Sequence, residues 1–236
     1  MKALLLAAGL GIRLRPVTDN IPKCLVPIQG RPLLAYWLRL LIEGGCQPLL
    51  VNTHYFADKV EGYINGSEYR SCVKTVYEGE LLGTGGTVLK NRSFFGCDPF
   101  MLIHADNLSQ FDVRAFIARH EARPAGCAIT MMTFATPTPE SCGVVELDDQ
   151  GVVQAFHEKV KNPPGNLANG AVYILEGSVF DFLESLNKSK IDFSTEVLPY
   201  YLGKIYTFHN DVYHRDIGTL ESYILAEKEF IGRGDG

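Results

Sequence analysis

The first 123 residues alternate short apolar runs with segments of helical periodicity, and this alternation restricts the fold more than any other feature of the chain. Apolar runs of strand length lie at residues 2–7, 48–53, 73–77 and 99–104, and helical spacing is found over 32–44, 56–64 and 112–123. Runs that are apolar at every position are typical of strands buried on both faces. Strands that alternate with helices in this way predict parallel βαβ units.

The pattern changes after residue 126. Strand-like runs follow at 127–135, 143–147, 152–157, 171–175, 204–208 and 212–214, and helices are expected over 178–186, 194–202 and 219–230. Part of this half is therefore expected to be antiparallel. The whole predicts an α/β fold, a Rossmann-like layered α/β/α arrangement around a mostly parallel mixed sheet. No repeat or linker interrupts the chain, so we expect a single domain over 1–236, with halves of about 1–125 and 126–236 and a frayed tail at 232–236.

Composition excludes several classes of protein. The 22 basic and 27 acidic residues give a net charge of −5, which argues against a general nucleic-acid-binding or anionic-membrane surface. No apolar stretch approaches the ~18 residues of a membrane span, and the amino terminus lacks the features of a signal peptide, so we expect a cytoplasmic protein. The six cysteines form no C-x-x-C pair and are expected to be reduced thiols, mostly in the core.

A glycine-rich turn follows the first expected strand. Residues 1–40 hold six basic side chains against the single acid Asp19, and Gly9 and Gly11 lie in the middle of this basic segment. Because glycine has no Cβ, backbone N–H groups in such a turn can approach phosphate oxygens. Arg13 and Lys23 follow closely and could neutralise a triphosphate or a leaving pyrophosphate. A solvated basic face is the alternative interpretation.

Two common nucleotide-binding motifs do not match this turn. The dinucleotide fingerprint requires a third glycine where Leu14 stands and an acid at the end of the second strand, where Asn52, Thr53 and His54 are found. A Walker A sequence does not occur. A nicotinamide-dependent oxidoreductase is therefore disfavoured.

The pattern L-A-A-G-x-G-x-R-L, followed by P-K-x-L-V-P-I and G-x-P-L-L, resembles the signature of the sugar-1-phosphate nucleotidyltransferases, or sugar-nucleotide pyrophosphorylases. Six further segments occur in the family's order: L-G-T-G-G at 82–86, H-A-D-N at 104–107, G-V-V-E at 143–146, H-E-K at 157–159, N-G-A-V-Y at 169–173 and D-I-G-T at 216–219. The short chain, L-G-T-G-G and F-S-T-E-V-L-P most resemble the mannose- and heptose-1-phosphate guanylyltransferases. Small or apolar departures, Ile12, Cys24, Ala105 and Val160, leave the charged groups in place.

The resemblance implies a role for each matching segment. It makes residues 1–125 the nucleotide-binding half, with contacts from Leu6, Ala7, Ala8, Gly9, Gly11, Gly83 and Thr84. It makes residues 126–236 the sugar-phosphate-binding half, with contacts from Gly143, Glu158, Lys159, Asn169 and Gly170. Arg13, Lys23, Asp106 and Asp216 would act on the reacting phosphates. An ordinary turn at 169–170 and a solvated strand-end Lys159 are the alternatives.

The implied chemistry needs no general base, because a sugar 1-phosphate is already an anion that can attack the α-phosphorus of an NTP. The difficulty is to gather several negative charges, which Mg²⁺ and fixed cations can neutralise. Asp106 and Asp216 at strand ends suit an oxygen-ligated Mg²⁺ that also binds phosphates. Taken singly, each aspartate could instead be a turn or helix cap.

Base choice is expected to depend on Glu78 or Glu80, just before residues 82–86. Guanine presents two neighbouring donors that a carboxylate can accept, whereas uracil and thymine place a donor between two acceptors. Both acids could equally be solvated loop residues.

The sequence thus predicts Mg²⁺-dependent transfer of a nucleotidyl group from an NTP, with GTP favoured, to a sugar 1-phosphate of manno configuration, hexose or heptose. The product would serve the synthesis of glycoconjugates or surface polysaccharides such as lipopolysaccharide or capsule. Uridylyl, thymidylyl or cytidylyl transfer and a non-catalytic sugar-nucleotide sensor are the alternatives. No nucleic-acid or membrane partner is expected, and a homo-oligomer is left open.

Overall fold

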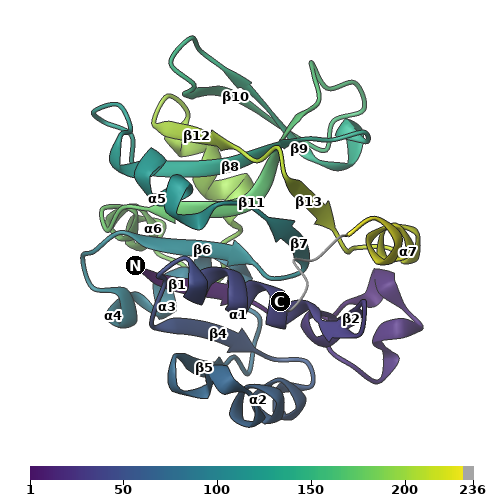
Figure 1. The fold of residues 1–236 in the computed structure, drawn as a ribbon. Coiled ribbons are helices and arrows are strands. Elements are labelled where there is room, and N and C mark those ends of the chain that lie inside the picture. Colours follow the sequence, from purple (N-terminus) through teal and green to yellow (C-terminus); the bar gives the residue numbers. More distant parts are fainter. Residues whose placement is uncertain (231–236) are drawn as a thin grey trace.

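The computed structural model describes residues 1–230. Its main sheet has the order β10-β9-β11-β6-β1-β4-β5, with β8 paired to β11 and β12 to β8 (Figure 1). These strands span Lys2–Leu6 (β1), Leu49–Thr53 (β4), Val73–Tyr77 (β5), Phe100–His104 (β6), Ile129–Ala135 (β8), Gly143–Leu147 (β9), Val153–Glu158 (β10), Leu167–Leu175 (β11) and Ile205–His209 (β12). The four strands from the first half are parallel, whereas β11 runs antiparallel to β6, β8 and β9. The predicted α/β class with antiparallel additions is confirmed.

Helices cover both faces of this sheet because successive residues of its central strands point to opposite sides. In β1, Ala3 and Leu5 pack with α1, α2 and α5, while Leu4 packs with α3, α4 and α6. The helices span Leu33–Glu43 (α1), Ala57–Gly66 (α2), Gly83–Lys90 (α3), Arg92–Phe95 (α4), Val113–Glu121 (α5), Val179–Ser185 (α6) and Leu220–Glu229 (α7). The layered α/β/α arrangement follows from cores on both faces.

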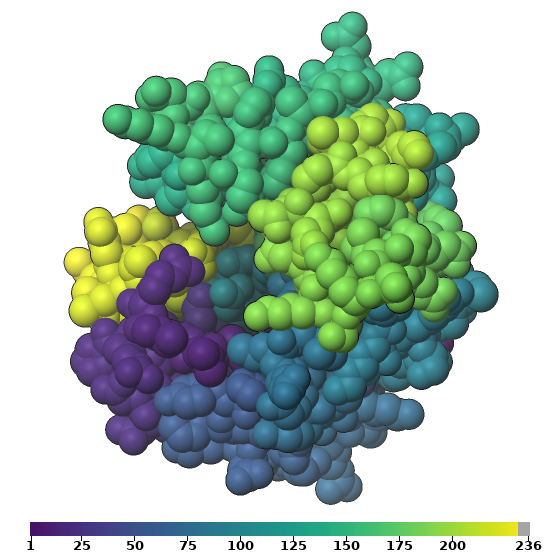
Figure 2. Space-filling model, turned by 180° about the vertical axis from the view of Figure 1, so that it is seen from behind, coloured from purple at the N-terminus to yellow at the C-terminus, as the bar shows by residue number. Residues whose placement is uncertain are grey.

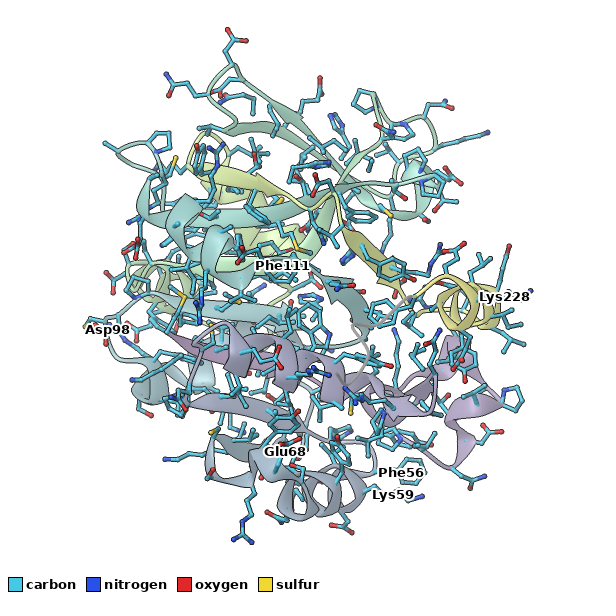
Figure 3. All side chains as sticks on the ribbon, in the orientation of Figure 1. Phe56, Lys59, Glu68, Asp98, Phe111 and Lys228 are labelled. Carbon is cyan, nitrogen blue, oxygen red and sulfur yellow. The ribbon has the colours of Figure 1, made fainter. Side chains whose placement is uncertain are left out.

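The two halves of the chain share the first of these cores. Phe111, labelled in Figure 3 between the lower parallel strands and the upper antiparallel ones, contacts the rings of Trp37 from the first half and Phe208 from the second. Its ring centroid lies 6.4 Å from that of Trp37 and 6.3 Å from that of Phe208. Segments far apart in the sequence are thus held together by one apolar cluster.

Two short ribbons lie outside the main sheet. Strand β2 (Pro27–Ile28) pairs with β3 (Arg31–Pro32), and β7 (Asn107–Gln110) pairs antiparallel with β13 (Tyr213–Asp216). A third apolar cluster, which includes Leu14, Leu108 and Ile217, packs the N-terminal loop against this second ribbon. The β7–β13 ribbon therefore brings the C-terminal part of the chain to the glycine-rich turn.

Several elements differ from the sequence prediction. The L-G-T-G-G segment is mostly the first turn of α3 rather than a loop, and the helix expected over 194–202 is a π-helical turn followed by a 3₁₀ turn. Strand β7 was not expected, because its pairing partner lies more than a hundred residues away. Asp112 caps α5 as expected, accepting bonds from the backbone N–H groups of Arg114 and Ala115. The expected frayed tail at 232–236 lies outside the described residues.

Within residues 1–230 all six cysteines are free thiols, and Cys24, Cys46 and Cys127 are buried. No helix in this described part of the chain is long and apolar enough to cross a membrane.

Candidate active site

A cavity of about 210 Å³ lies at the carboxyl ends of β1, β4, β5 and β6. Its lining combines residues expected to bind nucleotide with others that were not: Leu6, Ala7, Ala8, Gly9, Lys23, Cys24, Asn52, Glu78, Leu81, Gly83, Thr84, Thr87, His104, Ala105 and Asp106. Figure 2 shows the molecule hollowed at its centre, between the purple N-terminal segment and the green segments of the second half. Ligands of open α/β sheets bind at this end of the strands.

The two glycines of the glycine-rich turn have different surroundings. Gly11 has a φ of +63°, and a Cβ there would lie 3.0 Å from the Thr18 side chain. The carbonyl oxygen of Gly11 also accepts a 2.7 Å bond from the Thr18 hydroxyl. Glycine is needed at this position for both conformation and space. Gly9, by contrast, lines the cavity with open space around its Cα, so its backbone is accessible to a ligand.

Lys23, Asp106 and Asp216 form one charged group. The ammonium of Lys23, whose residue is only 6% exposed, lies 2.8 Å from Asp106 Oδ2 and 3.5 Å from Asp216 Oδ1. Asp106 follows β6 and Asp216 ends β13, and the backbone N–H of Ile217 donates to the carbonyl oxygen of Asp106. The structure thus brings together three residues that are widely separated in the sequence.

These contacts decide the charge state of the group. Partial burial would raise the pKa of Asp106, but the Lys23 ammonium beside it holds this pKa below the usual range, so the carboxyl is ionised at neutral pH. Burial lowers the pKa of His104, whose ring is therefore neutral. The Nε2 atom of His104 is buried without a hydrogen-bond partner among the described residues. A polar atom in that position is suited to meet a ligand.

The two carboxylates fit the Mg²⁺ that the sequence predicted. Their oxygens are the hard donors that Mg²⁺ prefers, and a Cβ on Gly218 would lie 2.6 Å from Asp216 Oδ2. Glycine at 218 thus leaves room for the Asp216 carboxylate. No group of three or more His, Cys, Asp or Glu side chains suited to a metal occurs in residues 1–230. The remaining ligands would come from phosphate oxygens and water, as is usual for Mg²⁺.

Glu78 and Glu80 lie in different environments. Glu78 is 1% exposed, and its Oε1 atom lies 3.2 Å from Asn52 Nδ2 and 2.7 Å from Thr87 Oγ1. Glu80 is exposed and does not line the cavity. The two positions differ because Glu78 directly follows β5 and its backbone N–H still donates to the carbonyl oxygen of Thr53 at the end of β4, while Glu80 lies in the following loop. Of the two acids expected to meet the base, only Glu78 therefore lines the cavity.

Arg13 lies on the glycine-rich turn but does not line the cavity. Its side chain is exposed and makes no hydrogen bond or ion pair within residues 1–230. It is therefore free to reach a ligand held above the turn.

The residues expected to bind the sugar phosphate lie outside the cavity, on β9, β10 and β11 and, for Lys159, directly after β10. Glu158 and Lys159 pair with each other at 3.3 Å, and the Lys159 side chain is 64% exposed. A Cβ on Gly143 would lie 2.7 Å from Glu158 Oε2, so glycine there leaves space for that carboxylate.

Asn169 and Gly170 have structural roles in β11. The Asn169 amide donates to the hydroxyl of Tyr173 at 2.6 Å and accepts from the backbone N–H of Ala171. A Cβ on Gly170 would lie 2.7 Å from Met132 Cε. The Asn169 side chain thus has one amide hydrogen and one lone pair left for a ligand.

Six lining residues were not recognised from the sequence as part of the site: Cys24, Asn52, Leu81, Thr87, His104 and Ala105. Asn52 and His104 stand at the carboxyl ends of buried strands, a position that could have identified them. Thr87 is one turn into α3, and no signal in the sequence sets it apart from an ordinary helical threonine.

The family described as nucleotidyl transferase matches residues 2–231 of this chain. The chain belongs to the nucleotidyl transferase family. This confirms the resemblance drawn from the sequence. The chain is 32% identical over 231 residues to a D-glycero-alpha-D-manno-heptose 1-phosphate guanylyltransferase from Aneurinibacillus thermoaerophilus, covering 97% of this chain and 98% of that protein.

Other nucleotidyl transferases use other bases. The chain is 29% identical over 250 residues to a UTP–glucose-1-phosphate uridylyltransferase from Synechocystis, covering 99% of this chain but only 64% of that longer protein. Among solved structures, HddC from Yersinia pseudotuberculosis in complex with GMP-PN superposes with a TM-score of 0.80 at 28% identity, over 96% of this chain and 98% of that one. The family is common to all three, while the base and the sugar differ within it.

Proposed function

We propose that this nucleotidyl transferase catalyses Mg²⁺-dependent transfer of a nucleotidyl group from GTP to a sugar 1-phosphate of manno configuration, with release of pyrophosphate. The single observation that carries the proposal is the union of Lys23, Asp106 and Asp216 at one edge of the nucleotide cavity. One cation and two carboxylates from three distant segments form a site suited to phosphate chemistry.

Each side chain of the site has a separate role in the proposed reaction. Mg²⁺ bound by Asp106 and Asp216 would neutralise phosphate charge and align the reacting groups. Lys23 and Arg13 would stabilise the charge on the triphosphate and on the departing pyrophosphate. Lys159 would bind the phosphate of the acceptor, and Glu158 would accept hydrogen bonds from its hydroxyls. No side chain needs to remove a proton, because the attacking phosphate oxygen is already anionic.

The preference for GTP rests on the carboxylate of Glu78 in the cavity and on the two guanine-linked proteins described above. An ionised carboxylate only accepts hydrogen bonds. Guanine offers it two adjacent donors, whereas uracil and thymine flank their one donor with carbonyl oxygens that the carboxylate repels. A polar site of this kind rejects bases that leave its groups unpaired.

A product assay tests the proposal. Purified protein is incubated with Mg²⁺, one of GTP, UTP, CTP, dTTP or ATP, and a panel of sugar 1-phosphates, and both pyrophosphate and NDP-sugar are measured. We expect the fastest turnover with GTP and a manno-configured hexose or heptose. Fastest turnover with UTP or dTTP would overturn the guanylyl assignment alone. Binding without any product would favour the alternative of a sugar-nucleotide sensor.

A further inference from the structure

We propose that Asn52 and Thr87 are positioning residues that hold the Glu78 carboxylate in the orientation that selects the nucleotide base. The inference rests on the proposed function, since it assigns how that site chooses its nucleotide. Neither residue needs to touch the base. Both act through Glu78, which lines the cavity between them.

All three side chains are almost fully buried. Asn52 is 3% exposed, Glu78 1% and Thr87 2%, and they come from the end of β4, the residue after β5 and the middle of α3. A buried carboxylate without hydrogen-bond donors would be strongly unfavourable. The donors that Asn52 and Thr87 provide therefore stabilise Glu78 inside the cavity and also fix the direction of its side chain.

The hydrogen-bond partners of Asn52 determine the orientation of its side-chain amide. Its Oδ1 atom accepts a 2.7 Å bond from the backbone N–H of Ala7, and its Nδ2 atom donates to Glu78 Oε1. A reversed amide would set a donor against the Ala7 N–H and an acceptor against the carboxylate. Asn52 thus links the carboxylate of Glu78 to the glycine-rich turn, and aspartate could not replace it.

Thr87 must also act as a donor. Its Oγ1 atom lies 2.7 Å from Glu78 Oε1 and 3.0 Å from the carbonyl oxygen of Gly83, and both neighbours are acceptors. The single hydroxyl proton can serve only one of them well, and the carboxylate is closer. A second contact, from Asn91 Nδ2 to the backbone oxygen of Thr87, fixes this turn of α3.

As a result, the two oxygens of the Glu78 carboxylate have different hydrogen-bond partners. Oε1 receives both donors, while no hydrogen bond reaches Oε2 of Glu78 from the residues that the structure describes. Oε2, which has two lone pairs, is thus the oxygen left to receive the two adjacent donors of guanine. If the two supports were removed, the carboxylate could rotate and offer either oxygen, and the site would distinguish guanine from uracil less well.

The experiment measures base discrimination rather than activity alone. Steady-state kinetics give kcat/KM for GTP and for UTP with Thr87→Val, which removes the hydroxyl at constant shape, and with Asn52→Asp, which keeps the acceptor for Ala7 but removes the donor to Glu78. We expect the GTP-to-UTP ratio to fall roughly tenfold in each, the effect of about one lost hydrogen bond. Thr87→Ser, which keeps the hydroxyl, should restore the wild-type ratio.

Thr53→Val is the matched control. Thr53 is the neighbour of Asn52, and its hydroxyl is buried without a hydrogen-bond partner among the described residues. This variant should keep the wild-type ratio. An unchanged ratio in both Thr87→Val and Asn52→Asp, with altered melting temperature alone, would show that the two residues are structural and would overturn the inference.

Dissociation constants for fluorescent GTP and UTP analogues separate this inference from the proposed function. If wild-type protein binds nucleotide but forms no product, the proposed function fails, and the ratio of the two constants still tests Asn52 and Thr87. If wild type prefers another nucleotide, the guanylyl assignment fails. The same variants should then reduce discrimination between the preferred nucleotide and the others, and an unchanged ratio would again overturn the positioning role.

Discussion

The proposed nucleotide end and the proposed sugar end of this molecule are built differently. At the nucleotide end, Asn52, Glu78 and Thr87 are buried and joined by hydrogen bonds. At the sugar end, the Lys159 side chain is 64% exposed and forms an ion pair with its own neighbour Glu158. The first end is therefore preorganised, whereas the second has charged groups that remain solvated.

The difference arises from the two parts of the sheet. The nucleotide end lies where parallel strands, covered on both faces, finish beside one another, so their terminal side chains are surrounded by packed residues. The sugar end lies on the hairpin β9–β10, whose outward residues meet solvent. We infer that the buried, hydrogen-bonded side chains at the nucleotide end determine which base binds. We also infer that the exposed side chains at the sugar end become ordered when the sugar phosphate binds.

The largest effect is expected where the two ends meet. Asp106→Asn and Asp216→Asn should each lower kcat by roughly a thousandfold or more at saturating Mg²⁺, because each removes an anionic ligand from the ion that aligns both substrates. The variants should remain folded by circular dichroism. Near-wild-type turnover in a folded variant would identify that aspartate as a turn or cap residue.

The second prediction separates the two ends by kinetics. Arg13→Ala should lower kcat by roughly a hundredfold, since Arg13 lies beside the turn where the triphosphate is expected and would act mainly in the transition state. Lys159→Ala should chiefly raise KM for the sugar phosphate, by roughly tenfold, because it removes a ground-state contact. An exchange of the two patterns would mean that the substrates bind in the opposite halves.

The third prediction tests whether base choice depends on one buried acid. Glu78→Gln should reduce the GTP-to-UTP ratio of kcat/KM by roughly tenfold, because the amide offers a donor as well as an acceptor. The exposed Glu80→Gln is the control and should match wild type. If Glu80→Gln changed the GTP-to-UTP ratio more than Glu78→Gln, the base would be recognised by the loop and not by the buried cavity.

The smallest effect concerns a buried hydrogen-bond network that joins α5 of the first half to the second half, away from the residues expected to bind the sugar phosphate. His120 is buried between Thr130 and Glu176, and burial together with the Arg123 guanidinium lowers its pKa although Glu176 opposes this. The unfolded chain therefore binds a proton near pH 6.5 that the folded chain does not. Stability from the neutral ring is present above that pH and is lost as the pH falls below it.

Urea denaturation at pH 7.5 and pH 5.5 checks whether the free energy of unfolding falls as the pH is lowered. His120→Gln should lose less unfolding free energy on acidification than wild type, and His209→Gln at an exposed position should behave like wild type. An identical pH dependence for wild type and His120→Gln would show that the ring is protonated in the folded protein.

Local sequence patterns were sufficient for most of the fold. Residues 2–7 were expected as a strand buried on both faces, and β1 has Leu4 and Leu5 in the two opposite cores. The same patterns misassigned residues 82–86, because glycines that are poor helix formers begin α3 there. They are small because the segment at 189–191 packs against them: a Cβ on Gly86 would lie 2.2 Å from the carbonyl oxygen of Ser189. That contact is invisible to any local pattern.

The sequence alone determined the α/β class, the glycine-rich turn and the identity of the charged residues, because these depend on apolar periodicity and on short motifs. Only the tertiary structure decided which of them meet. It placed Asp216 beside Lys23 through the pairing of β13 with β7, distinguished Glu78 from Glu80, and brought Asn52 and Thr87 onto one carboxylate. The physical reason is that hydrogen bonding and burial act between residues that are close in space, and distance along the chain does not show which residues these are.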